Sequence, residues 1–551
     1  MAPYLTTQRV GAGSPKSPLL DVALAVVLIS VAVLYLQPGL SRWLNIYDEG
    51  LMVYGAVRVM DGHIPYRDFW GMYSPGQFYV LAGLFRLFGP SIMVERWWDV
   101  VVRAALACVV FFLARRLSSW RAAALVWLLT LAWLEYFGFF GYPIFTGLLF
   151  IFLSCLALTE GLRAAAEGRP NRRALALAGG LAGVAAWFRH DLAVYAIAAA
   201  VFVLFAHGVS RTVFNDAARR VAVADFARAV RRLMPYAIGL AVAVGPVAVL
   251  LLLSVPASEL LHQLLIFPLT VFPRMRQLPY PPLDLEKFPF YFPFVAYAAV
   301  ALVIALAAWR LRRAGPDEVC ALRDVRWRVW AAGAVMLFGL FGFNQANIRS
   351  DLIHIPQFFL PAVALFAPLM AGFRPVLREY NYAFAAPAVT IMLLLAFPAI
   401  SNYLSASSQP PPPHDVARAQ GAPVDPNQLH AIQFIRQATA PTDTIYSGVG
   451  RHDRIFVNDV MFYFLVERHS ATRYHELHPG QATTLLVQEE IVADLERNQT
   501  RYVVLSDMFN EVCEPNASCE STGVTLLDDY IRYHYSTVAQ YGPYRVLSRW
   551  R

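Results

Sequence analysis

The sequence predicts a multi-pass α-helical membrane protein with about eleven spans and a soluble α/β domain at its C-terminal end. Three observations support this prediction. Of the 551 residues, 58% are hydrophobic and only 15% are charged, whereas soluble globular proteins average about 25% charged residues. Long apolar runs follow one another from residue 19 to residue 401. The composition then changes to that of a soluble domain.

The apolar runs have the length that a helix needs to cross a bilayer, which is roughly 20 residues. Residues 1–18 form a polar tail, and residues 19–401 form the predicted transmembrane domain. The predicted spans lie near residues 19–38, 97–115, 119–136, 142–160, 174–189, 191–207, 234–254, 291–309, 329–346, 354–372 and 383–401.

The distribution of arginine predicts the orientation of the chain in an inner (plasma) membrane. The Arg-rich loops all fall on one side of the predicted spans, and this side is expected to be cytoplasmic. The N-terminal tail is then cytoplasmic, and most acids near span ends reach the external face. These loops also account for the net charge of +8, so we expect no nucleic-acid partner. The loops lie at 115–116, 163–173, 211–232, 310–328 and 374–378.

A proline-rich linker, expected at 402–424, separates the spans from an exterior α/β domain at 425–551. Cys513 and Cys519 lie close together in this domain and can pair if their loop faces an oxidising compartment. The domain is expected to contain helices at 427–437 and 485–498 and strands at 444–447, 502–505 and 544–547.

Two segments between spans have patterns of their own. Residues 209–232 have apolar side chains at helical spacing and predict an amphipathic helix on lipid headgroups. The loop at 255–290 is expected to be too rich in proline to form one helix. Its apolar part, residues 262–272, is predicted to dip into the edge of the membrane.

The first external loop, residues 45–96, opens with the adjacent acids Asp48 and Glu49. Acids beside a membrane span are costly unless they lie at the water boundary or serve a function. A carboxylate here can act as a general base towards a hydroxyl group or bind a divalent cation. The alternative is an acid pair favoured by a helix N-terminus. Adjacent helical residues point about 100° apart, so the two acids are not expected to share one ligand.

Two further polar clusters are candidates for a supporting and a phosphate-binding role. Arg67 and Asp68 lie in an aromatic turn, where they either support the first site or belong to an interfacial turn. The segment Arg189, His190 and Asp191 lies between two apolar runs. An arginine suits phosphate because its planar fork donates two hydrogen bonds. Asp191 can orient Arg189 or bind a metal, and the alternative for the segment is a polar hairpin.

Polar residues also enter the apolar run that follows residue 346. Arg349, Asp351 and His354 lie there, and the last two are three residues apart on one helix face. Arginine and histidine together can neutralise a phosphate leaving group. In the exterior domain, His475 and His478 have a spacing that can bind a metal, but a surface loop is the favoured interpretation of this segment and of Arg451 to Asp453.

An Asp-Glu pair in the first loop, followed by the segment GHIPYRDF at 62–69, many spans and an exterior α/β domain, resembles the GT-C glycosyltransferases. The similarity is to the protein O-mannosyltransferase and aminoarabinose-transferase-like group. The resemblance implies a polyprenyl-phosphate-linked sugar donor and an acceptor of the cell envelope, which is a glycan, a lipid or a protein. It implies that Asp48 and Glu49 activate the acceptor or contact a divalent metal such as Mg²⁺ or Mn²⁺, with Asp191 a further possible ligand.

The remaining roles rest on local chemistry and position. Donor-phosphate binding is assigned to Arg189, Arg349 and His354. Supporting roles are assigned to Arg67, Asp68, His190, Asp191 and Asp351. The expected reaction inverts the anomeric centre.

Two other functions compete with this one. A transporter or flippase of lipid-linked sugars also exposes charges in a membrane cavity, but more often has mid-span charges and inverted repeats. A non-catalytic partner in envelope-polysaccharide assembly has no need of Asp48. The gathering of acids on one face beside a large exterior domain favours the transferase.

Overall fold

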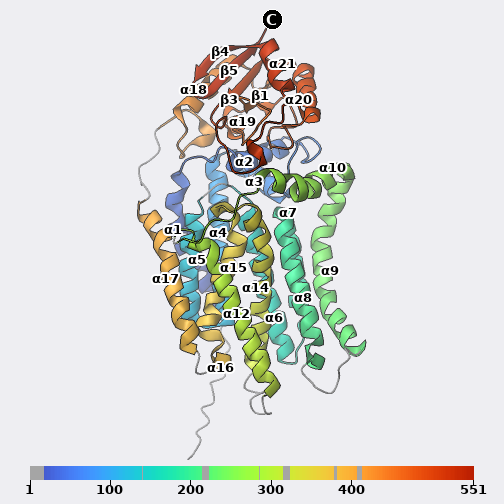
Figure 1. Ribbon diagram of the computed structural model, residues 1–551, viewed down its shortest axis with the longest axis vertical. Helices are drawn as coiled ribbons and strands as arrows, with labels where there is room; N and C mark the ends of the chain where they lie inside the picture. Colours follow the sequence, from blue (N-terminus) through green and yellow to red (C-terminus); the bar gives the residue numbers. More distant parts are fainter. Residues whose placement is uncertain are drawn as a thin grey trace, which may run out of the picture.

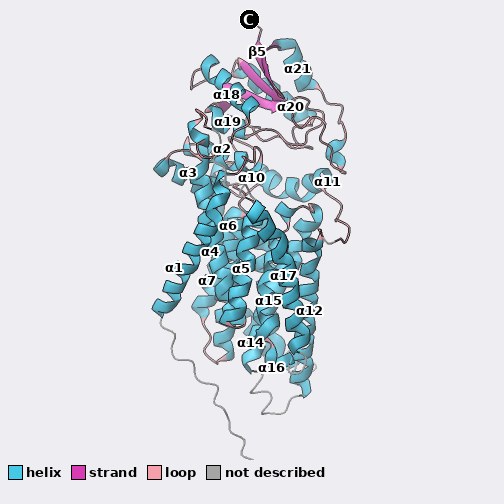
Figure 2. Cartoon of the chain, turned by 90° about the vertical axis from the view of Figure 1, so that its left-hand side faces the viewer, coloured by secondary structure: helices cyan, strands magenta, loops and turns pink. Residues whose placement is uncertain are grey.

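The computed structural model describes residues 18–138, 141–213, 223–284, 286–313, 323–377, 381–405 and 413–550. In this part of the chain, a long helical bundle has a smaller α/β domain on one of its ends (Figures 1 and 2). The bundle comes first in the sequence and the α/β domain last, as predicted. We call the latter the exterior domain after its predicted location, which stays a prediction. The predicted tail lies outside the described residues except for its last residue, Pro18.

Seven helical segments among the described residues are long and apolar enough to cross a membrane. They belong to α1 (Pro18–Leu36), α6 (Ile144–Ala166), α8 (His190–Val213), α9 (Val223–Ser254), α12 (Phe288–Arg313), α14 (Arg323–Ile348) and α17 (Asn381–Ser405).

Four further helices run in the same bundle (Figure 1). They are α4 (Ile92–Leu117), α5 (Trp120–Tyr136), α7 (Arg172–Phe188) and α15 (Pro356–Ala367). Each predicted span therefore falls on a helix. The first of the four contains buried charged residues and the other three are short, so the number of membrane crossings stays a prediction.

The predicted first external loop contains two helices, α2 (Asp48–Met60) and α3 (Gly76–Phe88). Helix α2 lies directly under the exterior domain (Figure 1), and the Met461 N–H donates a 2.9 Å hydrogen bond to the carbonyl oxygen of Ile46. A Cβ atom at Gly50 would lie 2.5 Å from the backbone nitrogen of Met461. Glycine at this position thus permits the close contact between the start of α2 and the exterior domain.

The loop at 255–290 does not form one helix, as predicted. Residues 257–276 form consecutive helical turns, α10 (Ala257–Leu261), the π-helix η2 (His262–Val271) and α11 (Phe272–Arg276). Helix α10 lies across the end of the bundle that faces the exterior domain (Figure 1). Pro268 lies within the π-helix and Pro273 at the start of α11. The sequence prediction did not include these helical turns, in which π-type hydrogen bonding accommodates residues that lack an amide donor.

The predicted amphipathic helix at 209–232 falls partly outside the described residues. Residues 214–222 belong to the part that the structure does not describe. Helix α8 ends at Val213 and α9 begins at Val223.

The exterior domain contains a five-stranded mixed sheet in the order β2-β1-β3-β5-β4. Strand β1 pairs in parallel with β2 and β3, and β5 pairs antiparallel with β3 and β4. The predicted strands and helices fall on observed elements. The five predicted elements correspond to α18 (Pro426–Ala438), β1 (Thr444–Val449), α20 (Leu485–Arg497), β3 (Tyr502–Ser506) and β5 (Tyr544–Arg549). The domain also contains four elements that were not predicted, α19 (Met461–Val466), β2 (His469–Ser470), α21 (Leu526–His534) and β4 (Tyr535–Tyr541).

The boundary between the two domains differs from the predicted linker at 402–424. Helix α17 continues to Ser405, and residues 406–412 lie outside the described part. Val416, Ala419 and Ala422 are fully buried in the core. The segment from residue 413 therefore already packs as part of the folded protein.

Candidate active site

Asp48 is held at the first turn of α2 by a neighbouring asparagine. The Asn45 Oδ1 atom accepts hydrogen bonds from the backbone N–H groups of Tyr47 (3.1 Å) and Asp48 (2.9 Å). The Nδ2 atom of the same residue donates to Asp48 Oδ2 over 3.2 Å. Burial raises the pKa of Asp48, although the positive charge of His354 and the Asn45 hydrogen bond act in the opposite direction. A raised pKa makes this carboxylate a stronger base.

Asp48 borders a cavity of about 220 Å³ between the bundle and the exterior domain, called here the Asp48 cavity. The polar side chains around it come from the first loop, from α11, from the segment after α14 and from the exterior domain. They are Asn45, Tyr47, Asp48, Tyr73, Arg276, Arg349, Asp351, His354 and His478.

Glu49 points away from this cavity, although it follows Asp48 in the chain. Its side chain is fully buried and forms a bidentate ion pair with Arg96 of α4, with N–O distances of 2.7 and 3.1 Å. The guanidinium of Arg96 also donates to the carbonyl oxygens of Leu40 and Arg42. Glu49 therefore joins α2 to α4, and this geometry favours a structural role over the predicted catalytic one.

The segment after α14 contributes three of the predicted residues to the Asp48 cavity. Asp351 accepts a 2.6 Å hydrogen bond from His354 Nδ1, and its Oδ1 atom caps the 3-10 turn Leu352–His354. Its Oδ2 atom lies 3.2 Å from Arg349 Nε. The sequence prediction that these residues gather with Asp48 on one side of the protein agrees with the structure.

Arg189, His190 and Asp191 border an adjoining cavity of about 460 Å³, called here the Arg189 cavity. Asp191 accepts two hydrogen bonds from Arg189, of 2.9 and 2.6 Å, and a third from Gln345. The buried Arg189 side chain keeps its Nη1 atom without a hydrogen-bond partner among the described residues. The two cavities share the side chains of Tyr73, Phe272 and His354. They therefore meet along one wall.

The outer wall of the Arg189 cavity is apolar. It includes Val194 of α8 and Leu265 and Leu269 of the π-helix, which are 59%, 45% and 69% exposed. Exposed aliphatic side chains at the end of an apolar bundle suit contact with lipid tails. The cavity that contains a free guanidinium nitrogen thus opens beside a lipid-compatible surface.

Arg67 and Asp68 border neither cavity. They form an ion pair of 2.8 Å, and Asp68 accepts a 2.7 Å hydrogen bond from the Ile64 N–H. Arg58 donates to the Asp68 carbonyl oxygen over 3.0 Å. The pair thus closes the turn that follows α2, and it shapes the first loop at a distance from Asp48.

Arg276, Tyr73 and His478 border the site but were not among the predicted site residues.

The prediction of a surface loop around His475 and His478 is wrong. The exposed fractions of these two residues are 2% and 4%. The ring of His478 contacts Trp70 and Phe267, and its Nε2 atom lies 2.5 Å from Glu476 Oε1 and 2.8 Å from the Tyr47 hydroxyl. The aromatic residues of 69–73 were the available sequence signal for such a buried contact.

Comparison with known proteins supports the predicted family. A family model described as dolichyl-phosphate-mannose-protein mannosyltransferase matches residues 73–230. The structure is similar to that of ArnT from Cupriavidus metallidurans bound to undecaprenyl phosphate, at 15% identity and a TM-score of 0.52 over 96% of this chain and 97% of that one. The chain has the fold of a GT-C membrane glycosyltransferase. Comparison with curated proteins finds no match.

A second GT-C structure shows the same likeness. The archaeal oligosaccharyltransferase AglB from Archaeoglobus fulgidus, in complex with an inhibitory peptide and a dolichol-phosphate, is 13% identical with a TM-score of 0.51. The similarity covers 95% of this chain and 74% of that one. Both likenesses extend over the bundle and the exterior domain of this chain.

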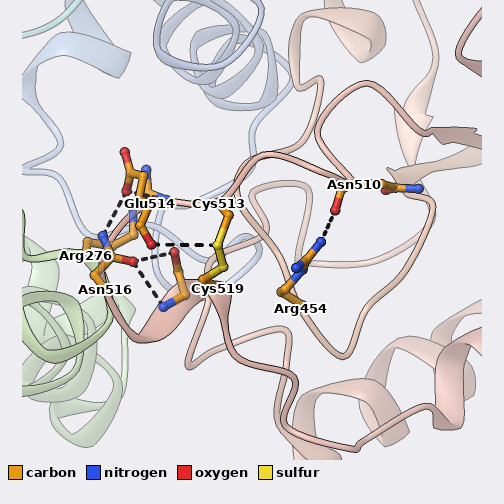
Figure 3. Close-up of a disulfide and its surroundings, with 8 residues drawn as sticks. Arg276, Arg454, Asn510, Cys513, Glu514, Asn516 and Cys519 are labelled. Carbon is orange, nitrogen blue, oxygen red and sulfur yellow. Dashed lines mark hydrogen bonds and ion pairs between the residues drawn. A yellow bond between two sulfur atoms is a disulfide. The ribbon is translucent and has the colours of Figure 1, made fainter.

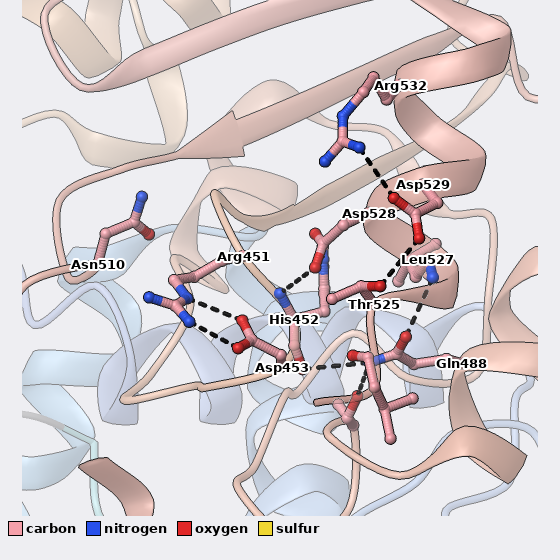
Figure 4. Close-up of polar contacts among 12 residues, drawn as sticks. Arg451, His452, Asp453, Gln488, Asn510, Thr525, Leu527, Asp528, Asp529 and Arg532 are labelled. Carbon is pink, nitrogen blue, oxygen red and sulfur yellow. Dashed lines mark hydrogen bonds and ion pairs between the residues drawn. The ribbon is translucent and has the colours of Figure 1, made fainter. Parts of the chain in front are cut away.

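A second polar cluster lies inside the exterior domain (Figure 4). His452 is fully buried between Asp528 and Tyr446, with distances of 2.7 and 2.8 Å, and Arg451 pairs with Asp453. The predicted surface loop at 451–453 is therefore wrong. The buried ring has partners on both nitrogens and borders neither cavity of the site, so we assign the cluster a structural role.

The predicted metal ligands do not fit a divalent ion in this arrangement. In the described part of the chain, no group of three His, Cys, Asp or Glu side chains is placed to hold one. Both carboxylate oxygens of Glu49 accept from Arg96, and both of Asp191 accept from Arg189. A role for Mg²⁺ or Mn²⁺ stays a prediction, and we derive no step through a metal.

Proposed function

We propose that this GT-C protein transfers a sugar from a polyprenyl-phosphate-linked donor to an acceptor of the cell envelope. The observation that supports this most directly is the junction of two cavities. One contains the carboxylate of Asp48, and the other contains the free Nη1 atom of Arg189 beside a lipid-compatible wall. A base and a phosphate ligand in adjoining cavities suit the two reactants of such a transfer.

In the proposed reaction, a hydroxyl oxygen of the acceptor attacks the anomeric carbon of the donor sugar. The Asp48 carboxylate takes the hydroxyl proton as this bond forms. The bond from the anomeric carbon to the phosphate oxygen breaks, and its electron pair leaves with the polyprenyl phosphate. A single displacement of this kind inverts the anomeric centre. Holding both reactants in adjoining cavities supplies much of the rate.

Arginine side chains stabilise the phosphate as it leaves. Arg189 presents its free Nη1 atom, and Arg349 and His354 border the neighbouring cavity. Hydrogen bonds from charged donors to phosphate oxygens are stronger than neutral ones, and they strengthen further as negative charge builds up. The likeness to ArnT bound to undecaprenyl phosphate and to AglB with a dolichol-phosphate supports a donor of this class.

The proposed location is the inner membrane, with the N-terminus cytoplasmic and the α/β domain exterior. The Arg-rich loops support this orientation, as does the disulfide between Cys513 and Cys519 in the exterior domain. Both cavities then open on the external face, where envelope acceptors are found. The acceptor is a glycan, a lipid or a protein of the envelope.

The test uses the purified full chain in sealed proteoliposomes with radiolabelled polyprenyl-phosphate sugars and an envelope extract. We expect labelled acceptor and free polyprenyl phosphate to form in equal amounts. Arg189→Ala should weaken donor binding roughly tenfold or more, because it removes a charged hydrogen-bond donor. Arg86→Ala, which removes an exposed arginine of α3, is the matched control. Movement of the donor across the bilayer without transfer would identify a flippase and overturn the proposal.

A further inference from the structure

Two arginines of the Asp48 cavity point at one carboxylate of the exterior domain. Glu514 accepts two hydrogen bonds from Arg349, with distances of 2.9 Å to Nη1 and 2.7 Å to Nη2. Arg276 Nη1 lies 3.5 Å from the same carboxylate. Figure 3 shows Arg276 and Glu514 turned towards each other beside the disulfide. The two guanidinium groups come from the last residue of α11 and from the residue that follows α14.

Both arginines are almost completely buried, with exposed fractions of 6% and 9%. The Arg276 guanidinium also donates to the Phe456 carbonyl oxygen over 3.2 Å, and Arg349 donates to the Arg276 carbonyl oxygen over 3.1 Å. Burial and the neighbouring charge of Arg349 lower the pKa of Arg276. Two like charges held this close in a buried place require an anion between them.

The anion that fills this place belongs to a short closed loop. Cys513 and Cys519 form a disulfide around Glu514 (Figure 3), and Asn516 donates a 3.0 Å hydrogen bond to the glutamate. Burial raises the pKa of Glu514, but the hydrogen bond from Arg349 and the charge of Arg276 outweigh it, so that the pKa lies below its ordinary value. The glutamate is thus an ionised carboxylate on a tethered segment.

The geometry of this contact is also the geometry of phosphate recognition. A guanidinium fork donates two parallel hydrogen bonds equally well to a carboxylate or to a phosphate. A terminal phosphate has three acceptor oxygens and close to two negative charges, about −1.5 to −2 at neutral pH. It can therefore engage Arg276 and Arg349 together more completely than one carboxylate does.

We propose that Arg276 and Arg349 form a phosphate site that Glu514 occupies until a phosphate-bearing ligand displaces it. This inference rests on the proposed function for the identity of the ligand, which is the phosphate of a polyprenyl carrier. Displacement frees the Cys513–Cys519 loop from the bundle, so ligand entry is coupled to a local movement of the exterior domain. The disulfide keeps Glu514 near the arginines by restricting the loop.

The test measures phosphate affinity in Glu514→Gln, which keeps the shape of the side chain and removes its charge. The probes are undecaprenyl phosphate and inorganic phosphate, each titrated against the purified full chain in detergent. We expect the affinity to rise roughly tenfold, because the ligand no longer competes with a charged hydrogen-bonded group. Glu511→Gln is the matched control, since it removes an exposed acid two residues before the Cys513–Cys519 loop.

If Glu514 served only to join the two domains, Glu514→Gln would not raise the phosphate affinity. Unchanged or weaker affinity in Glu514→Gln, in a variant whose unfolding temperature matches that of the wild type, would overturn the proposal. If the affinity rises for undecaprenyl phosphate alone, the ligand is the lipid carrier. If it also rises for inorganic phosphate, the phosphate group is sufficient for binding. Adding Arg276→Gln to Glu514→Gln should abolish the gain.

Reduction of the Cys513–Cys519 disulfide gives a second test of the displacement of Glu514. Dithiothreitol should raise the phosphate affinity of the wild-type chain by loosening the loop, and it should leave that of Glu514→Gln unchanged. An equal response of both chains would contradict the displacement of Glu514. None of these measurements depends on sugar transfer, so absence of transfer would count against the proposed function and not against this site.

Discussion

At the residue scale, Asp48 and Glu49 are adjacent in the chain but have different surroundings. They project about 100° apart from the first turn of α2. Asp48 borders a cavity and accepts one hydrogen bond from Asn45, whereas Glu49 is fully buried against Arg96. The raised pKa of Asp48 and its access to the cavity make it the base of the proposed reaction.

The pH dependence of transfer reports on Asp48. A base must be ionised, so the transfer rate should fall as the pH drops through a pKa that lies above the ordinary carboxyl value of 3.8. Asn45→Asp keeps an oxygen for the backbone N–H groups of α2, removes the donor to Asp48 and adds a negative charge. Both changes raise the pKa of Asp48, so the acid limb of the rate profile should move to higher pH.

The measurement is the rate of sugar transfer between pH 4 and pH 9 at saturating donor, for the wild type and for Asn45→Asp. Because Asp351 also faces Asp48 and raises its pKa while His354 and Arg349 lower it, these residues are left intact. A limb that stays in place, or that moves to lower pH, would show that another group is the base.

At the element scale, the ion pair between α2 and α4 fixes the position of the catalytic helix. Glu49 and Arg96 are both fully buried, and Arg96 also holds the two carbonyl groups of residues 40 and 42. Removing one partner leaves a buried charge without compensation, which is far more costly than losing a surface pair. The start of α2 is therefore held to the bundle on one side and to the exterior domain on the other.

Neutralising Glu49 should cost stability, whereas neutralising Asp48 should not. We expect Glu49→Gln to lower the free energy of unfolding by about 3 kcal/mol or more, because it leaves the Arg96 charge buried and unpaired. Asp48→Asn should leave it nearly unchanged, since a carboxyl with a raised pKa gains nothing from its charge in the folded state. Denaturant unfolding of both variants in detergent measures this difference. Equal losses would contradict the separate roles of the two acids.

At the scale of the whole molecule, the sequence predicted the elements better than their meeting points. Apolar runs and Arg-rich loops were sufficient for the bundle, the exterior domain and the side on which Asp48, Asp351 and His354 gather. Helical period and turn residues carry that information locally. The prolines of 255–290 predicted that this loop is not one helix, but they did not predict the helical turns at 257–276, where π-type hydrogen bonding keeps a proline-containing segment helical.

The composition of the site was harder to predict because it depends on contacts between distant segments. Arg276, His478 and Glu514 reach the first loop or its cavity from far along the chain, and no local pattern marks those contacts. The partner of Glu49, Arg96, is a charged residue directly before the predicted span at 97–115. A sequence gives the residue types of such a pair, while only the packing of α2 on α4 shows that they meet.

Asp48 removes the acceptor proton in the proposed reaction, and a comparison of two variants tests this role. The transfer rate is measured for Asp48→Asn and for Asp61→Asn, which neutralises an exposed acid at the other end of the same helix. We predict that Asp48→Asn binds the donor normally but transfers sugar about 10²- to 10⁴-fold more slowly, the usual cost of losing a general base, while Asp61→Asn matches the wild type. A folded Asp48→Asn chain that transfers sugar at the wild-type rate would contradict the account.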